Sequence, residues 1–197
     1  MSSRTRASSA VDNVPEGRAD WVPGTAGNPN ISVPGVDLVT VSTAVMVANR
    51  LYYEPVYVAT TITLDRLICE ITAGVAGNAR MGIYNADRDW QPTSLVVDGG
   101  QFATGVAAVI NLAINVTLQP NRYLFAIHAD AGPTVRFTRG GARYPGYGSS
   151  LGATPFTTQL FIALAYGPLA DPGIPWNTVT STTTATVHQV FCRVSVP

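Results

Sequence analysis

Apolar and polar residues alternate along most of the chain after Asp37, with the period of two that a β-strand requires. In the clearest run, the even-numbered positions from Ile110 to Leu118 are apolar, whereas positions 111, 115 and 117 are polar. No apolar stripe of helical period is present. Strands are predicted at residues 38–47, 52–59, 61–72, 79–84, 94–98, 107–118, 122–129, 134–138, 157–166 and 185–196. Closely spaced strands without helical crossovers predict an all-β, antiparallel, jelly-roll-like β-sandwich of nine or ten strands.

The run from Thr61 to Thr72 changes parity in its middle. Its apolar face is even-numbered at Ile62 and Leu64 and odd-numbered from Leu67 onward. A shift of one residue turns every later side chain to the other face of a sheet. We therefore expect a bulge at Asp65-Arg66, or a corner where the strand crosses between sheets.

Residues 1–36 are rich in proline and glycine and have almost no periodic apolar pattern. Such a composition disfavours both helix and sheet interior. We interpret 1–36 as an extended N-terminal arm and 37–197 as the sandwich domain. The arm is either disordered or ordered against a partner or a neighbouring copy. Its candidate anchors are Arg4, Arg6, Trp21 and Ile31.

Charged residues make up only 12% of the 197 residues, the net charge is zero, and every basic residue is arginine. This balance gives no electrostatic footprint for nucleic acid or an anionic membrane. No stretch approaches the length of a membrane span, and the N-terminus lacks the apolar run of a secretory signal. The chain is therefore expected in a cytosol at first, with Cys69 and Cys192 as buried thiols.

The segment Asn85 to Gln91 places oxygen-bearing side chains at every second residue, which is how a calcium loop presents its ligands. However, Trp90 occupies the position of the loop glycine, and Val96 occupies that of the bidentate glutamate. Asn and Asp also favour ordinary turns. Three readings remain open: a turn between strands, which is favoured; a loop that contacts a ligand or partner through Trp90; and a calcium site.

A second loop, residues 139–148, mixes glycine with arginine and tyrosine. Arg143, Tyr144 and Tyr147 are residue types that pack and hydrogen-bond well at recognition surfaces. This loop is either a flexible connection or a contact for a glycan or a protein.

Catalysis finds little support. His128 and His188 lie within strand patterns, where a histidine is usually a hydrogen-bonded core residue, and no hydrolase, zinc or redox motif is present. Glu54 and Glu70 could meet aspartates in space as paired carboxylates, but nothing in their placement favours this. We expect no enzyme activity, no catalytic residue, no cofactor and no metal.

The segment from Arg50 to Phe137 resembles a module of tailed-phage virion proteins. The resemblance rests on Leu51-Tyr52-Tyr53-Glu54-Pro55, Thr61 to Leu67, Met81-Gly82-Ile83-Tyr84-Asn85, Pro92 to Val97, and Leu118 to Ala126. The family usually has glycine at the position of Asn121 and often tryptophan near Leu124. It implies a β-sandwich of fibre, spike or decoration proteins that commonly form homotrimers, and it transfers no catalytic residue.

These observations predict a non-enzymatic structural protein of the virion, present in the host cytoplasm before assembly. It would be a capsid decoration (cement) protein or a short head or tail fibre, with capsid, portal or tail proteins as partners. The arm would dock on the particle while the sandwich is displayed outward, without nucleic acid binding or membrane insertion. The alternative is a receptor-binding fibre tip for host attachment that recognises surface glycan through Trp90, Arg143, Tyr144 and Tyr147.

Overall fold

A computed structural model of the chain describes residues 41–58, 60–139, 157–176, 178–182, 186–188 and 191–194. All regular elements in these residues are strands, and all pairings between them are antiparallel. Sheet A contains β1 (Val41–Val45), β3 (Ile62–Ala73), β6 (Ala108–Leu118), β8 (Thr134–Arg139), β11 (Thr186–His188) and β12 (Phe191–Val194). Sheet B contains β2 (Arg50–Val58), β4 (Asn78–Ala86), β5 (Pro92–Ala103), β7 (Asn121–Ala129), β9 (Thr157–Ala163) and β10 (Thr178–Thr182).

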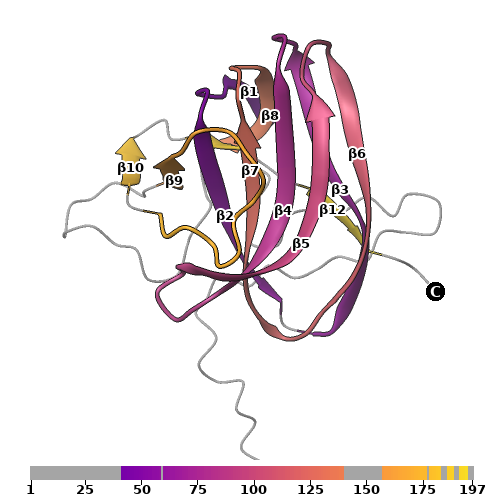
Figure 1. The fold of residues 1–197 in the computed structure, drawn as a ribbon, viewed down its shortest axis with the longest axis vertical. Helices are drawn as coiled ribbons and strands as arrows, with labels where there is room; N and C mark the ends of the chain where they lie inside the picture. Colours follow the sequence, from indigo (N-terminus) through magenta and orange to yellow (C-terminus); the bar gives the residue numbers. More distant parts are fainter. Residues whose placement is uncertain are drawn as a thin grey trace, which may run out of the picture.

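The first eight strands are arranged as a jelly roll. Pairing gives the order β1-β8-β3-β6 in sheet A and β2-β7-β4-β5 in sheet B (Figure 1). Each successive strand changes sheet except at the β4–β5 hairpin, which is the jelly-roll order. The last four strands extend this framework, because β9 and β10 continue sheet B beyond β2. The predicted antiparallel jelly-roll-like sandwich is thus confirmed.

The two C-terminal strands fill a gap in sheet A. β8 pairs with β3 only at Ile71 and Ala73, whereas β12 pairs with β3 from Leu64 to Ile68. Both contacts lie on the edge of β3 opposite β6, since Ile71 and the β3 residues that pair with β12 also pair with β6. β11 pairs with β8 on the edge opposite β1. β11 and β12 therefore lie between β8 and β3.

The main core lies between the two sheets and follows the alternation of the sequence. On β7 the inward residues are Tyr123, Phe125, Ile127 and Ala129, all of them buried. The even-numbered apolar row of β6 packs against the same core. The inward faces of both strands are those that the sequence pattern predicts.

The parity change in β3 is a local irregularity rather than a corner. The register with β6 shifts between Leu64 and Arg66, so the predicted bulge at this point is confirmed. β3 remains in sheet A along its whole length, so it does not cross between sheets. Leu64 and Leu67 both face the core and are 0% exposed.

Several strand boundaries differ from the sequence prediction. β5 continues through Gly99 and Gly100 to Ala103, because a bulge with a positive φ of 97° at Gly100 lets the strand pass the glycine pair. β10 was not predicted, since its Thr-rich sequence lacks an apolar face. The predicted arm, residues 1–36, lies outside the described residues.

Candidate functional site

The structure describes one of the predicted contact residues, Trp90. The predicted loop residues Arg143, Tyr144 and Tyr147 lie outside the described residues, as do the predicted arm anchors Arg4, Arg6, Trp21 and Ile31. Of the two histidines, the side chain of His128 is described and that of His188 is not.

The segment Asn85 to Gln91 is a hydrogen-bonded turn. Asp87 Oδ1 accepts hydrogen bonds from the backbone N–H groups of Asp89 (2.8 Å) and Gln91 (2.9 Å). The backbone N–H of Trp90 donates to the carbonyl of Asp87 (3.2 Å). The Asp87 carboxylate thus stabilises its own turn, which confirms the turn reading. Within the described part of the chain, no three His, Cys, Asp or Glu side chains are placed to hold a metal.

Trp90 does not present an exposed ring, contrary to the role predicted for it. Its side chain is 7% exposed and its φ is +59°. The Arg122 guanidinium lies 5.6 Å from the ring centroid, and Trp176 Nε1 donates a hydrogen bond of 2.7 Å to the Trp90 carbonyl. The segment around Trp176 therefore covers Trp90. The glycan-contact prediction assumed an exposed ring, whereas the chain itself already covers this one.

A second apolar core lies on the outer face of sheet B. It is formed by sheet residues and by the segment after β9, residues 164–176, which crosses the sheet as the orange loop in Figure 1. Leu169 packs over Gly82, where an added Cβ would lie 2.3 Å from Leu169 Cδ1. Tyr53 donates a hydrogen bond to the Ile174 carbonyl (2.8 Å). We call residues 164–176 the covering segment.

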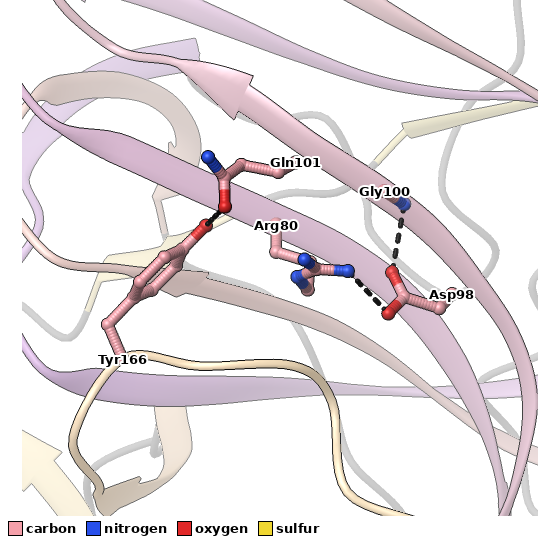
Figure 2. Close-up of polar contacts among 5 residues, drawn as sticks. All are labelled: Arg80, Asp98, Gly100, Gln101 and Tyr166. Atoms are coloured by element: carbon pink, nitrogen blue, oxygen red, sulfur yellow. Dashed lines mark hydrogen bonds and ion pairs between the residues drawn. The ribbon is translucent and has the colours of Figure 1, made fainter.

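A polar cluster lies under the N-terminal part of the covering segment. Figure 2 shows part of it: Arg80 on β4, Asp98 and Gln101 on β5, and Tyr166 on the covering segment. An Arg80 guanidinium nitrogen lies 2.6 Å from Asp98 Oδ2, and Asp98 Oδ1 accepts from the backbone N–H of Gly100 (2.8 Å). The β5 bulge thus positions Asp98 to neutralise Arg80.

Hydrogen bonds extend the cluster across three strands. The Tyr166 hydroxyl donates to Gln101 Oε1 (3.2 Å), and Gln101 Nε2 donates to Asn78 Oδ1 (3.1 Å). Asn78 in turn donates through its backbone N–H and its side chain to Asp130, at 2.6 and 3.2 Å. These bonds link the covering segment to β5, β4 and the end of β7.

His128 is the buried member of the cluster. It is 1% exposed, pairs across the sheet with Arg80, and its ring centroid lies 5.2 Å from that of Tyr166. Its Nε2 lies 3.0 Å from the Leu164 carbonyl, which can only accept, so Nε2 carries the proton. Burial lowers the pKa of His128, so the ring is neutral. Its Nδ1 has no hydrogen-bond partner among the described residues.

The cluster fastens the covering segment to sheet B. Arg80 is paired with Asp98, and the Tyr166 hydroxyl is hydrogen-bonded to Gln101. Burial raises the pKa of the Cys69 thiol to about 12, far from the range of a reactive thiolate. Sequence reasoning placed His128 on the correct strand face but gave no signal for Tyr166.

The two glutamates considered as a carboxylate pair point in different directions. Glu54 is 2% exposed and, by the alternation of β2, faces the main core from sheet B. Glu70 points away from the main core on β3 and is bound by Arg136 through two hydrogen bonds, which lowers the pKa of Glu70. Glu54 and Glu70 therefore do not form a carboxylate pair with each other.

Comparisons with family models, with curated proteins and with solved structures give no match to this chain. Among the residues that the structure describes, there is no helix with the length and apolar character needed to cross a membrane.

The histidine gives the cluster a pH dependence that can be measured. Because the pKa of His128 is lower in the folded chain than the ordinary value of 6.5, the unfolded chain binds the proton more readily. The contribution of His128 to stability is therefore present above pH 6.5 and is lost as the pH falls below it, by at most about 1.4 kcal/mol per pH unit. We expect the free energy of unfolding to fall between pH 7 and pH 5.

Denaturant unfolding of the wild type and of His128→Gln at both pH values measures this effect. Glutamine can still donate to the Leu164 carbonyl but does not titrate. The wild type should lose more stability on acidification than the variant does, and the difference isolates His128 from every other titrating group. Equal losses in the two proteins would contradict the assignment.

Proposed function

We propose that this chain is a non-enzymatic structural protein of a tailed-phage particle, either a capsid decoration protein or a short head or tail fibre. Residues 1–36 dock on capsid, portal or tail proteins, and the sandwich is displayed outward. The resemblance to virion proteins also implies a homotrimer. The chain would be found in the virion and, before assembly, in the host cytoplasm.

One observation carries the proposal: the jelly roll is complete within β1 to β8, and β1 begins at Val41. All eight of its strands therefore follow the proline- and glycine-rich residues 1–36 in the sequence. The arm is thus separate from the jelly roll along the chain and can serve in docking. A segment of that composition gains order most readily by lying along a partner. The region of resemblance, residues 50–137, spans most of the same jelly roll.

The character of the described surface supports a structural role. The polar cluster fastens the covering segment to sheet B through hydrogen bonds and a neutralised ion pair. The outer face of β6 carries only small or uncharged side chains, which favours close contact between proteins over recognition of a charged ligand. The glycan-binding alternative has no support from the described residues, because Trp90 is buried.

Deletion of residues 1–36 tests the proposal directly. The truncated chain should keep a β-rich circular dichroism spectrum and a cooperative unfolding transition, because the eight jelly-roll strands are intact. Its incorporation into particles should fall at least about tenfold, since an arm that orders on its partner contributes the docking contacts. Particles assembled with full-length or truncated protein are purified and compared by quantitative protein analysis.

A full-length chain carrying Arg4→Ala, Arg6→Ala and Trp21→Ala tests the predicted anchors. Its incorporation into particles should lie between that of the full-length wild type and that of the truncated chain. The spectrum and the unfolding transition separate a docking defect from a folding defect. Normal incorporation of a folded, truncated protein would contradict the docking role of the arm.

A further inference from the structure

The strand β6 forms a free edge of sheet A. It is 11 residues long, and among the described residues it pairs with β3 alone. In Figure 1 it lies at one flank of the sandwich, next to the β5 edge of sheet B. An edge strand presents unpaired backbone N–H and C=O groups, and a long regular edge is a template for pairing with another chain.

Among the described residues, the other sheet edges are shorter or more often interrupted than β6. The edge strands β1 and β10 have only 5 residues each. β5 is longer, but three register shifts interrupt its pairing with β4, and Gly100 has a positive φ. Short strands and bulges are the usual means of blocking edge pairing. β6 is interrupted only once, where Ile114 and Asn115 lie opposite Asp65 of β3, and its alternation of exposed and half-buried residues continues through this point up to Leu118.

The composition of β6 also lacks the usual protection. No charged residue occurs between Gly99 and Asn121, and proline appears only after the strand, at Pro120. Edge strands of monomeric proteins commonly carry charged side chains or proline to prevent pairing. Residues 108–118 therefore lack this form of protection.

The inward side chains of β6 are incompletely covered by their own chain. Ile110, Leu112, Ile114 and Val116 pack against the main core yet remain only half-buried. Their neighbours on β3, such as Leu64 and Leu67, are 0% exposed. A strand added beyond β6 would cover this aliphatic row in the way that β6 covers the row of β3.

We propose that a second copy of this chain pairs with β6 in antiparallel orientation, so that the two β6 strands join two copies of sheet A about a twofold axis at Ala113. In this register Ala113 faces its own symmetry mate and Asn111 faces Asn115. Val109 faces Thr117 on the outer surface. On the inner surface Ile110 faces Val116 and Leu112 faces Ile114.

The self-pairing is favoured because each of these cross-strand pairs is compatible. Small residues meet at the axis, amides meet amides, and β-branched or aliphatic residues meet one another, which are stabilising combinations in antiparallel sheets. A twofold contact places each side chain near a copy of the same surface, so an uncharged strand avoids like-charge repulsion. The contact does not depend on the virion assignment, and it differs from a threefold association, which uses two different surfaces.

Ala113→Asp tests the contact. Within one chain Ala113 is exposed and faces Arg66, so an aspartate there has a partner of opposite charge and the fold should tolerate it. Across the twofold axis, however, two aspartates would meet. The dissociation constant for the two-copy contact should rise at least about tenfold, and the mass measured by sedimentation should be halved.

Thr43→Asp provides the matched control. Thr43 is exposed on β1 of the same sheet and faces Arg136, which Glu70 already binds. The variant therefore adds the same charge to an exposed position of sheet A away from β6. It should sediment as the wild type does. Equal dissociation caused by both variants would show a general effect of charge and would overturn the β6 contact.

Cysteine cross-linking tests the register. Directly opposed residues of an antiparallel pair have Cα atoms about 4.5–5.5 Å apart, within the range for a disulfide. Ala113→Cys should therefore give a covalent dimer under mild oxidation. Val109→Cys should not, because the two substituted residues would lie eight positions apart along the strands, about 26 Å.

The outcomes decide the proposal. A wild-type protein that remains a single copy at high micromolar concentration would overturn it, as would an assembly that Ala113→Asp leaves unchanged. A cross-link at Val109 but not at Ala113 would exclude the proposed register. Any of these results leaves the docking role of residues 1–36 intact, since the deletion experiment measures incorporation separately.

Discussion

Replacing Trp90 with alanine should lower the free energy of unfolding by about 3–5 kcal/mol, the usual cost of truncating a buried aromatic residue. The side chain is 7% exposed and packs in the second core with Tyr84 and Leu124. Its loss would leave a cavity between sheet B and the covering segment. Alanine would also retain the unfavourable positive φ of this position, so the backbone gains nothing from the change.

Urea unfolding followed by circular dichroism measures this effect, and Arg88→Ala is its control. Arg88 is an exposed neighbour in the same turn, so its truncation should change stability by no more than about 0.5 kcal/mol. If Trp90→Ala were as mild as Arg88→Ala, the ring would be a surface side chain. The contact role predicted from the sequence would then have to be reconsidered.

The elements with strong alternation were predictable from the sequence. β6 and β7 were predicted within one residue of their observed bounds, and their inward faces were identified correctly. This succeeds because one face of each strand packs on the main core, and burial imposes a period of two on the sequence. The parity change in β3 located the bulge for the same reason.

The second core could not be predicted in this way. The covering segment contains three prolines and forms no strand after Ala163, so its sequence resembles an ordinary surface loop. Its contacts with sheet B join residues distant in sequence, such as Trp176 and Trp90. No local pattern around Trp90 indicates that a segment about eighty residues later will bury it. For this reason the sequence predicted an exposed ring at Trp90, which is buried.

The candidate site was predictable only in part for a related reason. His128 lies on the strand face shared with Leu124 and Ala126, as expected, and one ring nitrogen bonds to a carbonyl. However, that carbonyl belongs to Leu164 on the covering segment. The Arg80–Asp98 pair depends on the bulge at Gly100, whereas the sequence suggested that the strand ended before the glycine pair.

The two sheets differ in how far their outer faces are covered by the chain itself. Sheet B packs on the main core with one face and on the covering segment with the other, so its central strands are almost wholly buried. Sheet A has no described covering segment on its outer face, where Thr63 and Thr117 hydrogen-bond and Val109 is 58% exposed. Among the described residues, the outer face of sheet A is therefore more open than that of sheet B, and the proposed β6 contact lies at the edge of this more open sheet.

Phe125→Ala should lower the free energy of unfolding by about 3–5 kcal/mol, because Phe125 is 1% exposed in the main core between Glu54 and Ile83 of the neighbouring strands. Phe102→Ala, at a half-buried position of the same core, should cost less.

The next residue on β7 toward the N-terminus, Leu124, faces the second core. β7 therefore belongs to both cores, and its unfolding disrupts both of them. During urea unfolding, near- and far-ultraviolet circular dichroism should report one shared transition. Separate transitions would show that the covering segment unfolds independently of the sandwich.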